Sequence, residues 1–398
     1  SRGLGDVYKR QTMRTVYINR LKPISIMKIL LLGEYSNVHY TLALGLRSLG
    51  HDVTLASDGD NWKNYPRDID MRRKSLSPLS SISYLWKTWN QIQSFKGYDI
   101  VQLINPVFIP LKGERIWPFY QKLRKTNGKI VMGAFGMDYY YVKCCLDFKT
   151  FEYSDFNFGN QERFSDENEC FKRDWLFGSK GILNQKIATD CDAIVAGLYE
   201  YYVSYLHHFD NTDKLHFIPF PIKVDPLSVQ SVNHSWTERE PVKIFAGIQK
   251  MRSAYKGTDI MLKAAQRVAA DYPEQCKLKI SESLPFNQYI KLMNDSDIIL
   301  DQLYSYTPAM NALEAMGRGL IAVTGGEPAN YQVLQETQLQ PIINVKPNEQ
   351  SVYDALANVV INRNSLIPRL KQESIQYIAK HHDFIKVAKQ YEHLYRSL

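Results

Sequence analysis

The sequence predicts an α/β protein with two open, mainly parallel sheets, and three observations lead to this fold class. Residues 297–326 read as strand, loop, helix and strand, beginning with the apolar run 298–300. Short apolar runs rich in β-branched residues are typical of buried parallel strands. Residues 27–56 repeat the arrangement, with MKILLLG as the first strand and a helix that ends near Gly50. A chain of 398 residues is also long enough for two or three domains.

The helix of the 297–326 unit offers a binding site for an anion. Thr307 is a good N-cap and Pro308 suits the first helical position, so we expect the helix to begin there. Its free amides, at residues 309–312, would face the carboxyl ends of the strands, where open α/β sheets bind ligands. A diphosphate and an adjoining sugar would then contact Thr307, Asn311, Ala312 and Glu314. An ordinary βαβ unit without a ligand would show the same pattern.

The amino-acid sequence of this helix resembles a segment of a known protein family. LEAMGRGLIAVTGG resembles the EAMA-x-G-x-PVV segment of retaining nucleotide-sugar glycosyltransferases of the family-4 type. The resemblance implies two facing Rossmann-like domains, which is the glycosyltransferase B fold, and a ribose contact through Glu314. In that family a further Glu, eight residues earlier, contacts the donor sugar. This chain has Tyr306 at that position, so it departs from the family pattern at the donor sugar.

A second segment resembles the donor-phosphate loop of the same family. Gly247, Arg252 and Lys256 stand in the pattern G-x4-R-x3-K-G, and the resemblance implies that the arginine and lysine grip the diphosphate. A departing nucleoside diphosphate gathers negative charge, which fixed cations stabilise in the transition state. A solvated basic loop is the alternative interpretation. By the same resemblance, the loop that contains Ser283 would contact the base of the donor.

The opening of the chain resembles the N-terminal, acceptor-side domain of the family. Because the second and third glycines of G-x-G-x-x-G are missing, Gly33 is interpreted as room for a substrate and not as a pyrophosphate cradle. In the family the loop after it faces the catalytic cleft, so the acceptor-side candidates are Gly33, Tyr35, Asn37 and His39. A histidine one turn into a helix is also often a solvated or capping residue.

Asp138 is the catalytic candidate of this first domain, beside Arg252 and Lys256 of the second. Related enzymes carry an acidic residue or a histidine next to the transferred sugar in the loop after this strand. An Asx turn or a helix N-cap would explain Asp138 equally well. Residues 142–180 are too long for a simple connection, so we expect an acceptor-side insertion or a surface flap that packs on the domain.

The chain divides into four predicted parts. Residues 1–26 are basic and differ sharply from the apolar segment that begins at Met27, which indicates a non-native or disordered extension. Residues 27–222 form the predicted acceptor-side Rossmann-like domain, and residues 223–380 the domain that binds the nucleotide sugar. Residues 381–398 form a predicted helix after a break at two adjacent histidines, and the resemblance implies that this helix returns to the first domain.

The composition and net charge of the chain limit the kinds of partner that we expect it to bind. A formal charge of +8 and a pI of about 9.0 suit anionic ligands such as nucleoside diphosphates, and also an anionic membrane surface. No apolar run approaches the roughly 20 residues needed to span a bilayer, so membrane contact would be peripheral. The basic residues look scattered and form no stripe, which argues against nucleic acid. The five cysteines lack the spacing of a zinc site, so we expect them to be reduced thiols in a cytoplasmic protein. If the protein binds the membrane, we expect it on the inner face.

The resemblance implies a hexosyltransferase-type glycosyltransferase of bacterial surface-polysaccharide biosynthesis. It would move a sugar from a nucleoside-diphosphate donor to a glycan or lipid-linked acceptor with retention of configuration. No D-x-D motif follows a suitable strand, so we expect no metal, and no cofactor apart from the donor substrate itself. Two alternatives stay open: a sugar-nucleotide epimerase of the same build, and a non-catalytic sugar-nucleotide-binding protein, which Tyr306 favours.

Overall fold

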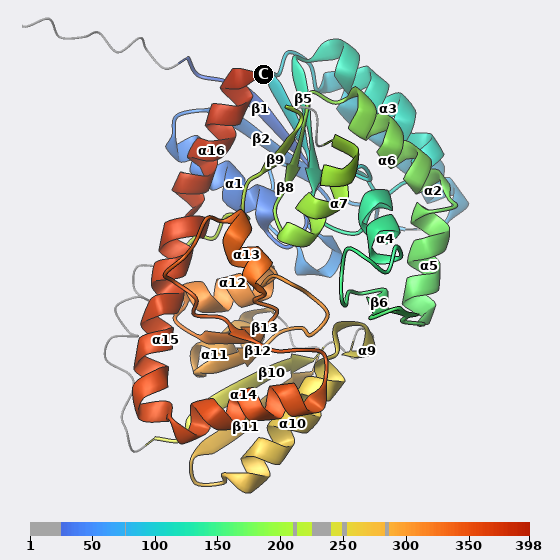
Figure 1. Ribbon diagram of the computed structural model, residues 1–398. Helices are drawn as coiled ribbons and strands as arrows, with labels where there is room; N and C mark the ends of the chain where they lie inside the picture. Colours follow the sequence, from blue (N-terminus) through green and yellow to red (C-terminus); the bar gives the residue numbers. More distant parts are fainter. Residues whose placement is uncertain (1–24, 76, 210–212, 225–239, 249–252, 283–285) are drawn as a thin grey trace, which may run out of the picture.

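The computed structural model describes residues 25–75, 77–209, 213–224, 240–248, 253–282 and 286–398 (Figure 1). Two parallel sheets form two α/β domains, drawn one above the other in Figure 1, so the predicted fold class is confirmed. Residues 1–24 of the proposed extension 1–26 lie outside the described residues, and so do residues 225–239 between the domains.

The first sheet has seven strands in the order β3-β2-β1-β4-β5-β8-β9, and every neighbouring pair is parallel. Helices cover both faces, so β4 and β8 are buried along their whole length, as expected for a doubly wound sheet. The strands are β1 (Lys28–Leu32), β2 (Asp52–Ser57), β3 (Ile69–Asp70), β4 (Ile100–Leu103), β5 (Lys129–Ala134), β8 (Ala193–Ala196) and β9 (Leu215–Phe217).

The helices of this domain connect its strands. They are α1 (Val38–Ser48), the short 3₁₀ helix η1 (Asn61–Lys63), α2 (Pro78–Ser94), α3 (Gly113–Thr126), α4 (Tyr139–Cys145), α5 (Asp166–Trp175), α6 (Ser179–Asp190) and α7 (Tyr199–Phe209). A small antiparallel hairpin, β6 (Asn157–Phe158) with β7 (Gln161–Glu162), lies between α4 and α5. The predicted insertion at residues 142–180 is therefore partly helical and contains this hairpin.

The second sheet has five strands in the order β11-β10-β12-β13-β14, again all parallel. Its strands are β10 (Val242–Ile248), β11 (Cys276–Glu282), β12 (Ile298–Leu300), β13 (Ile321–Thr324) and β14 (Ile343–Asn344). Its helices are α9 (Ser253–Lys256), α10 (Thr258–Asp271), α11 (Phe286–Asn294), α12 (Met310–Gly317), α13 (Pro328–Val333), α14 (Glu349–Ile361) and α15 (Arg363–Tyr377).

The end of the chain returns to the first domain, as the sequence predicts. A π-helical turn, Ile378–His382, separates α15 from α16 (Phe384–Ser397), which matches the predicted break at the adjacent histidines. Helix α16 lies along α1 in Figure 1. The two helices approach closely at Gly45, where an added Cβ would lie 2.4 Å from the carbonyl oxygen of Phe384. The buried face of α16, which includes Tyr391, joins the core of the first domain.

The predicted start of the donor-side helix is wrong. Helix α12 begins at Met310 with Ala309 as its N-cap residue, not at Thr307 and Pro308. Thr307 lies outside the helix because its amide and its hydroxyl are both hydrogen-bonded to Glu200 of the first domain. A contact from another domain therefore overrides the local capping preference.

None of the helices in the described ranges is both long enough and apolar enough to cross a bilayer. All five cysteines are free, and four of them are buried.

Candidate active site

Loops beyond the carboxyl ends of the two sheets meet, and a buried carboxylate fixes one contact between them. Glu200 lies in the first turn of α7 and reaches the loop after β12. Its Oε1 accepts hydrogen bonds from the amides of Tyr306 (2.6 Å) and Thr307 (2.9 Å), and its Oε2 accepts one from the Thr307 hydroxyl (2.5 Å). Burial raises the pKa of Glu200, while these hydrogen bonds act to lower it. The contact ties the approach to α12 to the first domain.

Tyr306, which stands where the resembling family has a Glu, belongs to the same contact. Its ring packs near Phe151, Tyr153 and Tyr199, with centroid distances of 5.5, 5.0 and 6.0 Å. Its hydroxyl accepts a hydrogen bond from the amide of Glu152 at 2.8 Å. The side chain therefore serves the contact between the domains, because its ring and its hydroxyl both have partners there.

Residues 151–163, called the bridging segment here, reach the loop after β13. The Tyr153 hydroxyl donates a hydrogen bond to Oε1 of Glu327 at 2.6 Å. The ammonium group of Lys346 lies 3.0 Å from the same carboxylate oxygen and 3.3 Å from the carboxylate of Glu152. These groups form a chain of charges and hydrogen bonds that runs from one domain to the other.

The bridging segment also positions α9. Arg163 donates hydrogen bonds to the carbonyl oxygens of Ala254 (3.0 Å) and Tyr255 (3.3 Å). Its guanidinium group lies over the ring of Tyr304, 3.1 Å from the centroid. Part of the predicted insertion therefore binds the donor-side domain through hydrogen bonds and a ring contact, which gives residues 142–180 a structural role.

Lys256 and Asn311, both predicted donor residues, meet at the start of α12. The Lys256 ammonium nitrogen lies 3.8 Å from Oδ1 of Asp301, and the Asn311 side-chain amide donates to the same oxygen at 3.0 Å. The Tyr289 hydroxyl donates to the Asn311 side-chain oxygen at 2.9 Å. We call Lys256, Asp301 and Asn311 the donor cluster. The other oxygen of Asp301 is buried and has no hydrogen-bond partner in the described part of the chain.

The other predicted donor residues stand in different positions. Arg252 and Ser283 lie outside the described residues. Ala312 is buried, so only its backbone can reach a ligand. It stands in the first turn of α12, where amides have no partner within the helix and the dipole favours an anion. Thr307 is also buried, and Glu200 already occupies its amide and its hydroxyl.

Glu314, the predicted ribose ligand, lies one turn into α12 and pairs with Arg318. Both contacts of the guanidinium group, at 2.5 and 3.0 Å, fall on Oε1. The charge of this carboxylate also affects a residue of the first domain. Burial, and then the negative charges of Asp60, Glu34 and Glu314, raise the pKa of Tyr65 in the first domain. Loops of the two domains thus share one electrostatic environment at this point.

The interpretation of Gly33 as room for a substrate is wrong. A Cβ at this position would lie 2.2 Å from Cγ2 of Ile104, so protein already fills the space. The glycine is required by this close approach and by its positive φ of 88°. The neighbouring carboxylate of Glu34 caps α1 instead, accepting hydrogen bonds from the amides of His39 (3.2 Å) and Tyr40 (2.8 Å). Burial raises the pKa of Glu34 to about 8.

The remaining acceptor-side candidates gather around the start of α1. His39 is fully buried, and its Nδ1 lies 2.8 Å from the carbonyl oxygen of Gly33. Burial lowers its pKa to about 3, so the ring is neutral at pH 7. Asn37 has a left-handed backbone and caps no amide with its side chain. The Tyr35 ring lies beside Gly136, and burial raises the pKa of its hydroxyl.

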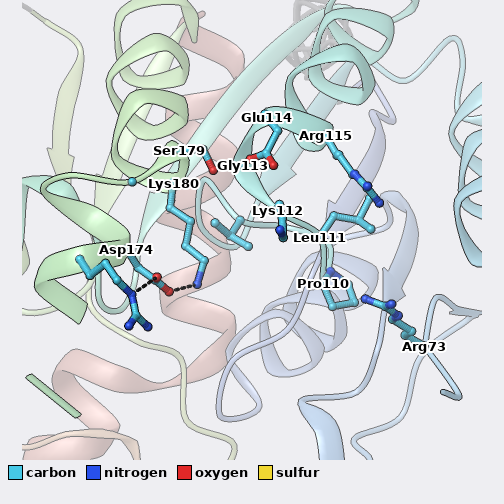
Figure 2. A pocket seen from close by; sticks show the side chains of 13 residues that line it. Arg73, Pro110, Leu111, Lys112, Gly113, Glu114, Arg115, Asp174, Ser179 and Lys180 are labelled. Atoms are coloured by element: carbon cyan, nitrogen blue, oxygen red, sulfur yellow. Dashed lines mark hydrogen bonds and ion pairs between the residues drawn. The ribbon is translucent and has the colours of Figure 1, made fainter. Parts of the chain in front are cut away.

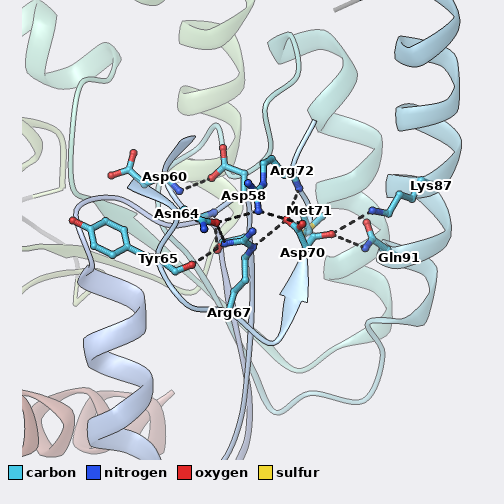
Figure 3. A network of polar contacts seen from close by, with 12 residues as sticks. Asp58, Asp60, Asn64, Tyr65, Arg67, Asp70, Met71, Arg72, Lys87 and Gln91 are labelled. Carbon is cyan, nitrogen blue, oxygen red and sulfur yellow. Dashed lines mark hydrogen bonds and ion pairs between the residues drawn. The ribbon is translucent and has the colours of Figure 1, made fainter. Parts of the chain in front are cut away.

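A polar network shapes the loop between β2 and β3 beside these residues (Figure 3). Asp60 accepts hydrogen bonds from the Ser36 amide (2.8 Å) and the Lys63 ammonium group (2.6 Å). Arg67 donates to Asp70 at 3.0 Å and to the carbonyl oxygen of Tyr65 at 2.8 Å. The network fixes this loop next to the first turn of α1.

Asp138 caps α4. Its Oδ1 accepts a hydrogen bond from the Tyr141 amide (2.9 Å) and its Oδ2 one from the Tyr205 hydroxyl (2.7 Å). The side chain is fully buried, and burial raises its pKa to about 6. The N-cap alternative describes what the residue does in this structure.

Comparisons with known proteins find similarity in structure alone. No protein-family model and no curated protein sequence matches the chain. Among solved structures, Anabaena HepE in complex with UDP and glucose has 11% identity and a TM-score of 0.58, covering 94% of this chain and 100% of its own. Sucrose-phosphate synthase from Thermosynechococcus elongatus has 12% identity and a TM-score of 0.59, with coverages of 93% and 98%. Arabidopsis thaliana starch synthase IV, bound to ADP and acarbose, has 12% and 0.56, with coverages of 94% and 99%.

The chain has the glycosyltransferase B fold. In this fold the donor cluster and Glu314 lie in the second domain, and the acceptor-side candidates lie in the first. No group of three or more histidine, cysteine, aspartate or glutamate side chains that could hold a metal occurs within the described ranges.

Sequence reasoning missed the contacts that join the two domains of the glycosyltransferase B fold. Glu200 and Arg163 make several of them, and each is hydrogen-bonded to residues about 90 to 107 positions away in the sequence. No local pattern marks either residue, because an acidic residue in the first turn of a helix is common. The one available signal was the unexplained length of residues 142–180.

Proposed function

We propose that this protein transfers a sugar from a nucleoside-diphosphate donor to a hydroxyl of a glycan or lipid-linked acceptor. One observation carries the proposal: Lys256, Asp301 and Asn311 converge at the amino end of α12, one turn before Glu314. The HepE structures, solved with UDP and with UDP-glucose, support the choice of donor class.

The donor cluster suits a leaving diphosphate. The ammonium group of Lys256 and the free amides in the first turn of α12 would stabilise the negative charge that develops when the bond to the sugar breaks. Arg252 would add a second cation. Oε2 of Glu314, the carboxylate oxygen that Arg318 leaves without a contact, would accept the ribose hydroxyls. In this proposal protein cations take the place of a metal ion.

We propose that the transfer retains the anomeric configuration, which the family resemblance implies. The leaving phosphate would take the proton from the acceptor hydroxyl on the face that the donor sugar leaves, so no separate general base is required. Asp138 fits a supporting role, because both of its oxygens hold protein groups. We propose that His39, neutral and fully buried beside the first loop, helps to shape the acceptor side without contacting the acceptor.

Tyr306 favours a second candidate, a protein that binds the nucleotide sugar without transferring it. The tyrosine supplies no carboxylate to the donor sugar, and its ring and hydroxyl hold the bridging segment. The two candidates differ in turnover: a transferase releases the nucleoside diphosphate only when an acceptor is present, whereas a binding protein releases none.

The test begins with a thermal-shift panel of UDP, GDP, ADP and CDP sugars. A ligand at 100 times its dissociation constant adds about 2.7 kcal/mol of stability, which gives a readable shift. The stabilising donor is then incubated with candidate acceptors, and the release of nucleoside diphosphate is measured. Stabilisation together with acceptor-dependent release supports transfer. Stabilisation without release favours the binding protein, and the absence of any stabilisation overturns the donor site.

We also propose where the protein acts. Five free thiols and a nucleotide-sugar donor fit the cytoplasmic side of the cell. A role in surface-polysaccharide assembly fits a lipid-linked acceptor.

A further inference from the structure

Helix α2 exposes an apolar stripe that the active site does not explain. Leu79, Ile82 and Trp86 are 82%, 67% and 71% exposed, and Trp89 is 38% exposed. Their spacing places all four on one side of the helix, across three turns. The opposite side carries the buried residues Tyr84, Thr88 and Ile92, which anchor the helix to the domain, so Leu79, Ile82 and Trp86 are not needed for that packing.

The segment of the chain that contains this stripe is strongly basic. Residues 71–130 contain eleven lysines and arginines and two acidic residues, an excess of nine, whereas the whole chain has an excess of eight, 49 against 41. The view that the basic residues are scattered is therefore wrong. Helix α2 itself contains no acidic residue.

The neighbouring helix places cations beside the stripe. The ring of Trp89 packs edge-on against Phe119 of α3, with centroids 5.3 Å apart. Arg115 and Lys122 stand about one turn before and after Phe119 on the same side of α3. Lys87 of α2 does not belong to this group, because its ammonium group donates a hydrogen bond to the carbonyl oxygen of Asp70. Trp89 therefore lies close to two cations of α3, Arg115 and Lys122.

A cationic pocket adjoins the same surface (Figure 2). It has a volume of about 710 Å³ and is lined by Glu114 and Asp174 but also by five cations, Arg73, Lys112, Arg115, Arg173 and Lys180. Asp174 is paired with Lys180 at 2.7 Å and lies 3.8 Å from Arg173, so the five cations still outnumber the two acidic groups. Arg73 connects the pocket to α2, because it donates a hydrogen bond to the Ser81 hydroxyl and lies over the ring of Tyr84.

We propose that α2, α3 and the adjoining pocket form a docking surface for an anionic lipid bilayer. Leu79, Ile82 and the tryptophans would enter the boundary between headgroups and acyl chains, and the surrounding cations would contact anionic headgroups. Charge decides between this partner and a second copy of the chain. Pairing two copies through α2 would bring the two basic surfaces against each other, whereas an anionic bilayer complements them. The proposal does not depend on the reaction proposed above.

Vesicle co-flotation of the full chain tests this surface. Vesicles of phosphatidylcholine alone are compared with vesicles that contain 30% phosphatidylglycerol, on the order of the anionic content of cell membranes. We expect at least tenfold tighter binding to the anionic vesicles, a loss of binding at about 0.5 M salt, and a blue shift of tryptophan emission on binding. Equal binding to both vesicle types, or no binding to either, overturns the proposal.

Variants locate the contact. Ile82→Glu and Trp86→Glu change exposed side chains, so both should fold, and circular dichroism checks that they do. Each should weaken binding to anionic vesicles at least tenfold. The control is Ile361→Glu, since Ile361 is 57% exposed on α14 of the other domain. The proposal fails if Ile361→Glu lowers binding as much as Trp86→Glu, or if Trp86→Glu instead abolishes a dimer seen by light scattering.

Discussion

Glu34 is a buried carboxylate whose environment disfavours its charge, and this has a consequence for the whole chain. Its pKa rises from 4.5 to about 8 on folding because burial outweighs the two amides that it caps. Between these pH values the folded chain holds a proton that the unfolded chain has lost. Folding stability should therefore fall as the pH rises from about 4.5 to 8, by up to about 4 kcal/mol.

Glu34→Gln tests this at the level of one residue. Glutamine keeps an oxygen acceptor for the α1 amides but does not titrate. We expect denaturation midpoints at pH 5 and pH 8 to differ less in the variant than in the wild type. Subtracting the two pH curves removes the contributions of Asp138 and His39, whose pKa values also change on folding. Parallel curves would contradict the assignment.

Glu200 should be worth more to stability than any single surface residue. Glu200→Ala leaves the amides of Tyr306 and Thr307 and one hydroxyl without partners, so we expect a loss of about 3 kcal/mol in the free energy of unfolding. Urea denaturation measures it. Glu274→Ala, at an exposed position, is the control and should stay within about 0.5 kcal/mol. Equal effects of the two changes would show that the interdomain contact does not form.

At the scale of elements, the bridging segment sets the position of α9 and hence of Lys256. Arg163→Lys keeps the charge but loses the planar stack on Tyr304 and the fork that reaches two carbonyl groups. We expect KM for the donor to rise about fivefold to tenfold, equivalent to about 1 to 1.4 kcal/mol, with a small change in Tm. The measurement is steady-state kinetics with the donor found in the panel.

Arg369→Lys is the matched control, because Arg369 is exposed on α15 and pairs with Glu373 at the surface. An unchanged KM in Arg163→Lys, or an equal rise in the control, would show that the bridging segment does not determine the position of α9.

The packing of α16 on α1 makes an unusual prediction for a helical glycine. Gly→Ala in a helix interior usually stabilises by roughly 1 kcal/mol. At Gly45 the added methyl group would lie 2.4 Å from the carbonyl oxygen of Phe384 and 2.7 Å from Cβ of Ala388. The steric clash should outweigh the gain in helix propensity, so we expect Gly45→Ala to lower the free energy of unfolding by about 1 to 3 kcal/mol and to lower Tm in calorimetry. A raised Tm for Gly45→Ala would mean that α16 does not pack there.

At the scale of the molecule, the sequence was sufficient for the architecture and insufficient for the interface. Two strand–loop–helix–strand units, each with local periodicity, predicted both sheets, and the family resemblance predicted the return of the last helix. The start of α12 was misplaced because the deciding partner, Glu200, belongs to the other domain. Gly33 was misread for a similar reason: Ile104, from the loop after a different strand, fills the space beside it. Capping and glycine preferences describe local structure, and both errors arose where a residue from a distant segment contacts the site.

In the candidate site, too, local sequence patterns predicted some residues correctly but did not predict their partners from distant segments. Lys256 and Asn311, placed by motif spacing, do meet in space, but through Asp301, whose buried carboxylate joins them. Tyr306, the departure from the family pattern, had no predicted partner because the bridging segment lies about 150 residues before it.

The dissociation constant of the nucleoside diphosphate tests the central claim, a diphosphate held by Lys256 at the start of α12. Isothermal titration calorimetry should be run on the wild type, on Lys256→Ala, and on Lys263→Ala as the exposed control on α10. A charge-assisted contact contributes about 1.5 to 3 kcal/mol, so Lys256→Ala should bind roughly 10- to 150-fold more weakly, with Lys263→Ala unchanged. Equal dissociation constants for the three proteins would contradict the site and the transfer reaction built on it.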